Sequence, residues 1–524
     1  MKAYLHTDAM KKRKAKFILA VSLILLFNPC LIFSQATFCT GNGGKYVYNV
    51  NTRLYYNSIQ EAINAPETKE NHTIIVSSGV YHENIVINKS ISLIGKNREE
   101  TILSGNGTDP TIKVLSNNVV IKNFTLKNSK TYGIYLRSNS TSITDIIIEN
   151  CHIGVVLFQS HENKISQIIA RNSSIGVLLD YSTTNHIQSN VIEDCTIGVR
   201  LGACSQNNIV EKNRIELCVN AIELGNQANY NIFVSNYIKR NTNGIYFQLS
   251  KNCTFIGNVF ARNMQGINIF LAASNHTFLY NSFFFNENNV KSSFNVTNIW
   301  NMEYPFGGNF WSNYNGVDKL SGVNQNKTGS DGIGDIPYIL DKNNVDRYPL
   351  VGSFIKIANA TVVQNKVYFI GCSANITIRE INFNEKNASL TLKAIENEKP
   401  FFCKIVIPKN FFEKPIEQLN ISVNEQPLSL QSISIKEVRD YVSLFFIYKY
   451  SPEQNNFSPI PATYIIGFLF AIVALFMIII RIRTISRVEK ELKKNNGNKN
   501  FINYNGCIFV FSRNRSKTPL PQTL

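Results

Sequence analysis

The chain has 524 residues and a formal net charge of +17, and aromatic residues make up 11% of it. Residues 1–16 carry +5 and residues 481–524 carry +8, which leaves +4 for everything between them. Because the positive charge lies at the two ends, it is typical of membrane topology, and no nucleic-acid partner is expected.

Residues 1–36 are interpreted as a secretory signal peptide. A lysine-rich start precedes an apolar run over residues 17–27, a break at Asn28-Pro29 and the small-residue pattern Ser34-Gln35-Ala36. This order predicts cleavage after Ala36, with an uncut anchor as the alternative. Either interpretation places the bulk of the chain outside the cytoplasm, and the many Asn-x-Ser/Thr sequons agree with a glycoprotein.

The next segment predicts a cap. Ser58-Ile59-Gln60-Glu61 matches a capping box that starts a short helix reaching about Ala65. Strands are expected after it, over residues 73–77, 85–94 and 111–115. A helix here would cover the apolar end and the unpaired edge of the first coil of a repeat structure.

Between residues 115 and 290 the sequence repeats with a period of 22 or 23. Apolar residues alternate within each copy, as in Gly176-Val177-Leu178-Leu179-Asp180, which predicts short strands rather than helices. We therefore predict an all-β chain in which residues 37–298 form a right-handed parallel β-helix of 22–23-residue coils with an N-terminal cap, closed by residues 299–351. Coils stacked roughly 4.8 Å apart would place β-branched side chains inside and asparagines in a ladder. That ladder is expected to comprise Asn123, Asn190, Asn213, Asn236, Asn258 and Asn281, with Asp145 and Gln167 in the missing rungs.

Several stretches resemble one known family. They are SIQEAIN, ENIVINKSISLIGKN, TILSGNGT, GGNFWSNYNG and DGIGDIPYILDKNNVDRYPL. Over about residues 55–351 the chain resembles the NosD-like right-handed β-helix repeat proteins, part of a pectate-lyase-like group of carbohydrate-binding and sugar-hydrolase modules. The resemblance implies an extracytoplasmic β-helix, and it links the chain both to copper-site maturation of nitrous-oxide reductase and to surface proteins.

Outward-facing positions after the glycine column supply the candidate ligand-binding residues. Aromatic and charged side chains on a flat strand face suit a saccharide, although mixed charges also keep a strand face soluble. Asp180 and Glu223 are expected two coils apart, roughly 10 Å, at or just beyond the spacing of an inverting glycosidase pair. The paired-Asp, His-Gly and Arg-x-Lys motifs of pectin-hydrolysing β-helix enzymes are absent, so no catalytic residue is assigned. The candidates are Tyr135, Arg137, Asp180, Arg200, Glu223, Tyr246 and Gln248.

Three cysteines, Cys151, Cys195 and Cys218, share one repeat position. We interpret them as small buried filler, because free cysteine is often buried and no histidine joins the column as a further ligand. With five methionines in the whole chain, a copper site is not expected.

Asp331-Gly332-Ile333-Gly334-Asp335 resembles a calcium loop. Lys327 and Gly329 stand upstream, where further acidic ligands are usual in the family. A structural loop is therefore the first interpretation, and calcium at Asp331 and Asp335 is the alternative.

From residue 352 to 452 separate alternating strands replace the repeat, which predicts a small β-sandwich. Cys372 and Cys403 fall in two of these strands and are a disulfide candidate, with two buried thiols as the alternative. A linker over residues 453–463 leads to the uncharged residues 464–480, which would span about 25 Å as a transmembrane helix. The basic residues of 481–524 predict a cytoplasmic tail.

We predict a single-pass membrane-anchored extracytoplasmic protein that is a non-catalytic carbohydrate-binding or cell-surface scaffold, its partner a polysaccharide or envelope glycan. Two other classes stay open. One is a periplasmic factor in copper handling and metalloenzyme maturation, and the other is a polysaccharide lyase or glycoside hydrolase.

Overall fold

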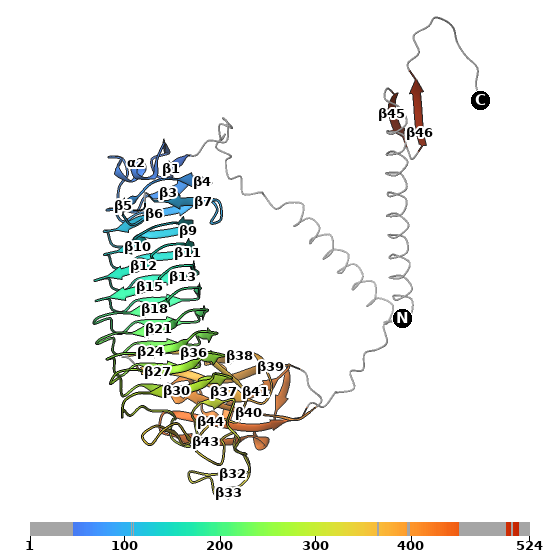
Figure 1. The fold of residues 1–524 in the computed structure, drawn as a ribbon. Coiled ribbons are helices and arrows are strands. Elements are labelled where there is room, and N and C mark those ends of the chain that lie inside the picture. The colour runs from blue at the N-terminus through green and yellow to red at the C-terminus, as the bar shows by residue number, and fades with distance from the viewer. Residues whose placement is uncertain are drawn as a thin grey trace, which may run out of the picture. The chain divides into compact units, whose positions relative to one another are not determined.

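The computed structural model describes residues 46–105, 107, 109–363, 366–395 and 399–449, together with residues 499–504 and 507–512 (Figure 1). Contacts divide the chain into two units, residues 1–449 and 450–524. Within the second unit, β45 (Lys499–Tyr504) and β46 (Cys507–Ser512) form an antiparallel hairpin. The predicted signal peptide, the linker 453–463 and the membrane span 464–480 lie outside the described residues. In the part of the chain that is described, no helix is both long and apolar enough to cross a membrane.

The first coil is capped as predicted. Helix α2 (Ile59–Asn64) begins after Ser58, whose Oγ accepts from the Glu61 N–H at 3.1 Å, and Glu61 Oε2 accepts from the Asn57 N–H at 3.1 Å. Ser58 therefore caps the helix, and Glu61 reaches back to Asn57, one residue before the position that a capping box uses. Beside the helix, β1 (Val47–Asn49) pairs antiparallel with β2 (Leu54–Tyr56) and with β3 (Thr73–Val76) of the first coil.

The predicted right-handed parallel β-helix is confirmed. One strand from each coil joins a ten-stranded parallel sheet, here called the open sheet. Its strands are β5 (Ile85–Ile87), β8 (Ile112–Val114), β10 (Tyr132–Leu136), β12 (Ile153–Phe158), β15 (Ile175–Asp180), β18 (Ile197–Leu201), β21 (Asn220–Leu224), β24 (Asn243–Phe247), β27 (Gln265–Ile269) and β30 (Asn288–Ser292).

The other sides of the coils form one large sheet whose strands lie in two rows separated by a bend. The first row contains β3 (Thr73–Val76), β6 (Ser92–Gly95), β13 (Lys164–Ser166), β16 (His186–Gln188), β19 (Ile209–Glu211), β22 (Ile232–Val234), β25 (Thr254–Ile256) and β28 (Thr277–Leu279). The second row contains β4 (Gly79–Tyr81), β7 (Thr101–Ser104), β14 (Ile169–Arg171), β17 (Val191–Glu193), β20 (Arg214–Glu216), β23 (Tyr237–Lys239), β26 (Val259–Ala261), β29 (Ser282–Phe284) and β31 (Phe310–Trp311). The longer β9 (Val120–Lys127) and β11 (Ser142–Glu149) pass through both rows.

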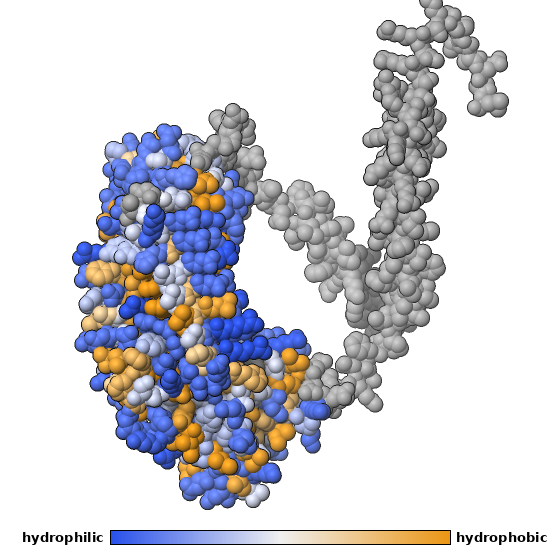
Figure 2. Space-filling view, viewed as in Figure 1, coloured by the Kyte–Doolittle hydropathy of each residue, from blue (hydrophilic) through white to orange (hydrophobic). Residues whose placement is uncertain are grey.

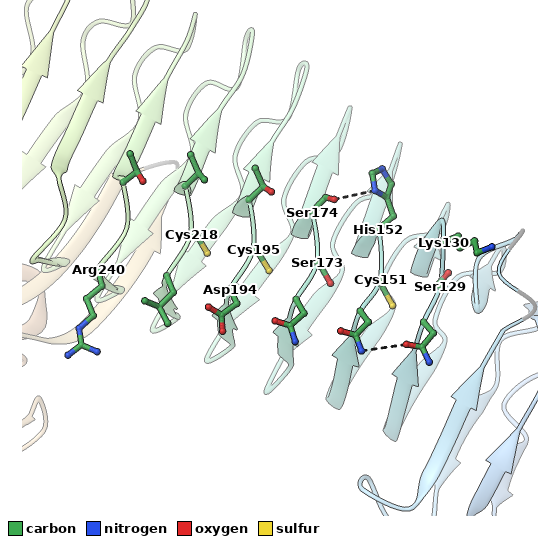
Figure 3. Close-up of a pocket in the computed structure, with 17 residues that line it drawn as sticks. Ser129, Lys130, Cys151, His152, Ser173, Ser174, Asp194, Cys195, Cys218 and Arg240 are labelled. Atoms are coloured by element: carbon green, nitrogen blue, oxygen red, sulfur yellow. Dashed lines mark hydrogen bonds between the residues drawn. The ribbon is translucent and has the colours of Figure 1, made fainter.

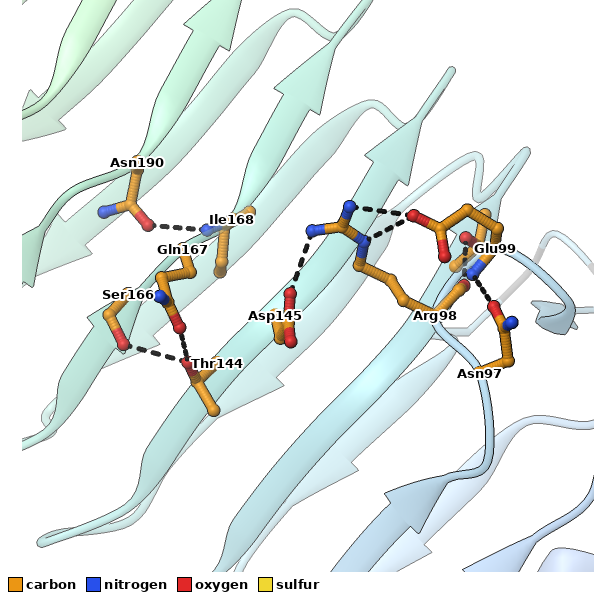
Figure 4. A network of polar contacts seen from close by, with 10 residues as sticks. Asn97, Arg98, Glu99, Thr144, Asp145, Ser166, Gln167, Ile168 and Asn190 are labelled. Atoms are coloured by element: carbon orange, nitrogen blue, oxygen red, sulfur yellow. Dashed lines mark hydrogen bonds and ion pairs between the residues drawn. The ribbon is translucent and has the colours of Figure 1, made fainter. Parts of the chain in front are cut away.

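The buried asparagine ladder begins at Asn190 and not, as expected, at Asn123. Asn190 Oδ1 accepts from the Ile168 N–H at 2.9 Å, so isoleucine holds this place in the preceding coil. Asp145 and Gln167 lie one residue earlier, at left-handed φ of 60° and 54°. There Asp145 pairs with Arg98 at 2.9 Å (Figure 4). An offset of one residue changes the face on which a strand side chain lies, so these two residues are outside the ladder.

Two further ladders were not foreseen. In each, a rung donates both its backbone N–H and its side-chain Nδ2 to the Oδ1 of the next coil, as Asn185 does to Asn208 at 2.9 and 3.0 Å. The hydrogen-bonding groups of these amides are therefore paired with the asparagine of the neighbouring coil. The members are Asn163, Asn185, Asn208 and Asn231 in one ladder, and Asn241, Asn263 and Asn286 in the other.

Aromatic residues close the last coil. Trp311 is buried and stacks on Phe283 at 4.3 Å and on Tyr338 at 4.4 Å between ring centroids. The short strands of this closing segment are β32 (Leu320–Ser321), β33 (Lys327–Thr328), β34 (Tyr338–Ile339) and β35 (Val345–Asp346).

Residues 354–448 form a second all-β part built on two sheets. The five-stranded sheet contains β36 (Phe354–Val363), β37 (Lys366–Ala374), β40 (Phe401–Pro408), β43 (Ser434–Val438) and β44 (Tyr441–Tyr448). The four-stranded sheet contains β38 (Ile378–Asn384), β39 (Ser389–Ala394), β41 (Asn420–Val423) and β42 (Gln426–Leu428). Short 3-10 turns cover Lys409–Phe411, Ile416–Gln418 and Leu430–Ser432.

This second part packs against the β-helix through an apolar cluster. In that cluster Phe369 and Val406 of the second part lie with Ile232 and Ile256, which belong to the first row of the large sheet. The open sheet lies on another side of the coils. Figure 2 shows hydrophilic residues over most of the first coils and separate apolar patches further along.

Candidate functional site

The register of the open sheet decides which candidate residues meet. Arg200, Glu223 and Tyr246 follow one another on β18, β21 and β24, and Tyr135 lies in the same column on β10. Asp180 lies in a second column, two residues further along, because it is opposite Phe158. By the same register Arg137 and Gln248 belong to this second column. We call the outward side of β10 to β27 the open face.

A chain of polar contacts crosses the open face. Arg200 Nε lies 3.2 Å from Glu223 Oε1, and Asn220 Nδ2 donates to Glu223 Oε2 at 2.8 Å. Asn243 then donates to Asn220 at 2.8 Å, and Asn268 donates to Asn243 at 2.9 Å. Glu223 is only 5% exposed, so its carboxylate is a paired member of this network and not a free group.

Asp180 is also engaged. Its Oδ1 accepts from the Ala203 N–H at 2.9 Å, and the glycine at position 202 leaves room for that carboxylate. Asp180 and Glu223 lie in different columns, and each is held by donors of the protein.

Aromatic residues stand at both ends of the polar chain. At the N-terminal end Tyr135 stacks on Tyr132 at 5.8 Å and on Phe158 at 6.5 Å between centroids. At the C-terminal end Tyr246 stacks on Phe270 at 5.6 Å. Burial raises the pKa of Tyr135 and of Tyr246, so both hydroxyls stay protonated at neutral pH. The sequence-based candidates did not include Phe158 and Phe270. Both residues fall in the same repeat position as Arg137 and Gln248, and that shared position could have identified them.

A groove of about 1110 Å³ runs beside the open face, along the turns that lead into its strands (Figure 3). One wall is formed by residues at left-handed φ, including Asn150, Asp194 and Arg240, and the other wall includes His152 and Thr196. The floor carries the cysteine column. The lining residues on successive coils form three parallel rows, and sequence analysis identified only the middle one.

The cysteine column is buried, as predicted. Cys151, Cys195 and Cys218 belong to the main apolar core. Burial raises the pKa of Cys151 to about 11, and contact with Cys195 together with burial raises the pKa of Cys218. The structure brings Cys195 and Cys218 together on adjacent coils, a pairing that sequence analysis did not note.

The loop with Asp331 and Asp335 is held by its own hydrogen bonds. Asp331 Oδ1 accepts from the Ile333 N–H at 3.2 Å, and Asp335 Oδ1 accepts from the Leu320 N–H at 3.0 Å. Lys404 donates to the Asp331 carbonyl at 2.9 Å, and its burial lowers the pKa of the ammonium to about 8. Among the described residues, no three His, Cys, Asp or Glu side chains are placed to hold a metal ion.

The two cysteines of the second part lie close together. Cys372 Sγ and Cys403 Sγ are 3.5 Å apart, both buried and both thiols in this structure. Their separation is compatible with the predicted disulfide, which stays a prediction.

The fold and its repeat positions define a parallel β-helix protein. The chain matches the family described as "Periplasmic copper-binding protein (NosD)" over residues 33–238 and again over residues 113–316, together more than half of its length. The chain therefore belongs to the NosD family.

A "Cell surface glycoprotein" of Methanothermus fervidus is 38% identical over 97 residues, which is 18% of this chain and 16% of that protein. The chain thus spans about a sixth of the length of this relative. Among solved structures, the A-module of the mannuronan C-5 epimerase AlgE6 of Azotobacter vinelandii is 14% identical, with a TM-score of 0.41, covering 46% of this chain and 74% of that one. An alginate lyase of a Paenibacillus species is 13% identical, with a TM-score of 0.35, covering 48% of this chain and 95% of that one.

The described residues do not fit a copper ion of the kind that the family's description names. Copper in proteins is held by converging thiolate, thioether or imidazole groups. No such set of three His, Cys, Asp or Glu side chains occurs among the described residues, and the raised pKa values of Cys151 and Cys218 oppose the thiolate form that binds metal. No chemistry through copper is therefore assigned to this part of the chain.

Proposed function

We propose that this protein is a membrane-anchored, extracytoplasmic scaffold that binds a carbohydrate chain along the open face without cleaving it. The observation that carries the proposal is the hydrogen-bonded row from Arg200 to Asn268, with Tyr135 beyond one end and Tyr246–Phe270 beside the other. Fixed donors and acceptors beside aromatic rings are the usual composition of a sugar site. The family's periplasmic description and the name of the cell surface glycoprotein support an extracytoplasmic place.

The geometry favours a ligand that runs along the helix axis. Tyr135 and Tyr246 are five coils apart in one column, which corresponds to roughly 24 Å at the coil spacing. A linear oligosaccharide is long enough to contact both ends, whereas a single sugar is not. Arg200, Glu223 and the amides would then contact the middle of the chain.

The membrane anchor belongs to the same proposal. A signal peptide over residues 1–36 and a span over residues 464–480 would hold the β-helix outside the membrane, with residues 481–524 in the cytoplasm. We propose that the two sheets of residues 354–448 pack as a β-sandwich between the β-helix and the linker. In that role the second part covers one side of the last coils.

A glycan array with the full-length protein in mild detergent tests the proposal, followed by calorimetry on the best hits. Tyr246→Ala should weaken binding about tenfold or more, because an aromatic contact is lost. Tyr237→Ala is the matched control, since Tyr237 is an exposed tyrosine of the large sheet and not of the open face. Equal losses in both variants would contradict a site on the open face.

The same preparation separates the other two classes. If the protein released shorter products from a polysaccharide, and Asp180→Asn or Glu223→Gln abolished that release while affinity stayed, the enzyme alternative would replace the scaffold. One tight copper ion per chain in a parallel titration would favour the metal-handling alternative. Affinity loss without product release at any stage supports the scaffold.

A further inference from the structure

Gln265 carries an acceptor on the open face that the protein itself does not use. The side chain is the next member of the column after Asn243, on β27. It is 6% exposed, and its Oε1 has no hydrogen-bond partner among the described residues. Asn220 and Asn243, in the same column, have their carbonyl oxygens occupied by neighbouring amides. A buried acceptor without a donor is unfavourable, and this oxygen is enclosed by the protein. A ligand hydroxyl that pairs with it when the Gln265 amide turns outward therefore gains affinity there.

An apolar surface adjoins this acceptor. Phe270 follows directly after β27, is 48% exposed and stacks on Tyr246. The edge of this ring pair offers contact to the C–H groups of a pyranose ring, while Gln265 lies within the same two coils. A hydroxyl donor next to an apolar C–H face is the pattern that a pyranose ring presents.

The charges in the middle of the open face oppose an acidic polymer. Arg200 is already paired with Glu223, and Asp180 forms no ion pair among the described residues. The region from β15 to β27 therefore carries one net negative charge on its outward columns, from Asp180, Arg200 and Glu223. Outside that region, the cationic side chains of the two columns lie towards the ends, at Lys113, Arg137 and Lys291. A uronate in the middle would meet two carboxylates, and the one cation there, Arg200, is already ion-paired with Glu223.

We infer that the ligand of the open face is a neutral polysaccharide, with one of its hydroxyl groups donating to Gln265 Oε1 and a pyranose ring against the Tyr246–Phe270 pair. This inference rests on the proposed carbohydrate-binding function and specifies its ligand class. It also names Gln265 and Phe270 as specificity residues, neither of which was among the sequence-based candidates.

Calorimetry on the full-length protein in mild detergent tests the inference with two sets of hexasaccharides. The neutral set is cellohexaose, mannohexaose and chitohexaose, and the acidic set is the hexamers of galacturonate and guluronate. We expect at least one neutral hexamer to bind and both acidic hexamers to bind at least tenfold more weakly. Gln265→Leu keeps the size of the side chain but removes the acceptor, and should weaken neutral binding about tenfold. Gln265→Glu retains an acceptor and should recover most of that loss.

Gln418→Leu is the control, because Gln418 is an exposed glutamine of the second part of the chain. Melting curves of all variants report whether each one folds. Stronger binding of an acidic hexamer would overturn the inference and leave the proposed function standing. Neutral binding that is unchanged in Gln265→Leu would overturn the assignment of this residue. Absence of binding to every saccharide, on the array as well, would instead remove the proposed function.

Discussion

Asn236 and Asn258 lie one above the other on adjacent coils, and both the backbone N–H and the side-chain Nδ2 of Asn236 donate to the same Oδ1 of Asn258, at 3.0 and 2.9 Å. Asn236 Nδ2 also donates to the Val210 carbonyl at 2.8 Å. Its own Oδ1 accepts two bonds from Asn213. Each rung therefore ties three coils together, and its removal leaves unpaired groups on both sides.

The first prediction follows from this rung. Asn236→Ala should lower the free energy of unfolding by about 3 kcal/mol or more, since several buried polar groups lose their partners at once. Chemical denaturation measures the change. Asn226→Ala is the control, because Asn226 is exposed on the same coil, and it should stay within about 0.5 kcal/mol of the parent. Similar values for the two variants would mean that the ladder adds little stability.

Val199 tests the interior column. It is fully buried and stacked between Val177 and Ile222 on neighbouring coils. Val199→Asp should cost several kcal/mol, because an unpaired charge enters an apolar interior unless it takes up a proton. Thr196→Asp places the same carboxylate on an exposed position of the same coil. If both variants melted within a degree or two of the parent, the coil register would be wrong.

His276 predicts a pH dependence. It replaces asparagine in one ladder, where its Nδ1 accepts from the Cys253 N–H at 3.1 Å, and burial lowers its pKa to about 3. In the unfolded state the His276 imidazole takes up a proton near pH 6.5, whereas in the folded state it does so only near pH 3. The contribution of the neutral, buried imidazole to stability is therefore complete above pH 6.5 and is lost as the pH falls towards 3. Relative to His276→Asn, the parent should lose a few kcal/mol between pH 6.5 and 3. Parallel denaturation curves would show this as a widening difference, and curves that stayed parallel at every pH would contradict it.

Gly257 lies where the second part of the chain meets the β-helix. Its φ is +63°, and a Cβ there would collide with the Ile357 side chain. Gly257→Ala should therefore destabilise the contact between the two parts, by backbone strain of roughly 1 kcal/mol and by the collision in addition. Limited proteolysis of the 352–452 region reports the loosening.

Two further variants separate the two causes. Adding Ile357→Ala should relieve the collision and leave only the strain. Gly329 has a φ of +124°, and a Cβ added there would meet nothing within 4 Å. The variant Gly329→Ala therefore reports backbone strain alone. If Gly257→Ala were no more sensitive to protease than Gly329→Ala, the close contact with Ile357 would not be important.

The sequence by itself determined the β-helix, because an in-register repeat translates each sequence column directly into a spatial column. The period and the β-branched interior were readable in this way, and the helix cap at Ser58 was readable from its local motif. The columns of Arg200, Glu223 and Tyr246 were readable for the same reason. The tertiary structure decided what the one-dimensional pattern leaves open. Asp145 and Gln167 matched the ladder by residue type but lie one position outside it, since a bend residue at left-handed φ shifts the face of the strand. Likewise, only side-chain packing across coils shows that Glu223 is paired with Arg200 and Asn220, and that Gln265 has an acceptor left over. Those properties depend on which side chains donate to or accept from each group. The partners come from neighbouring coils, so the sequence of a single repeat does not show them.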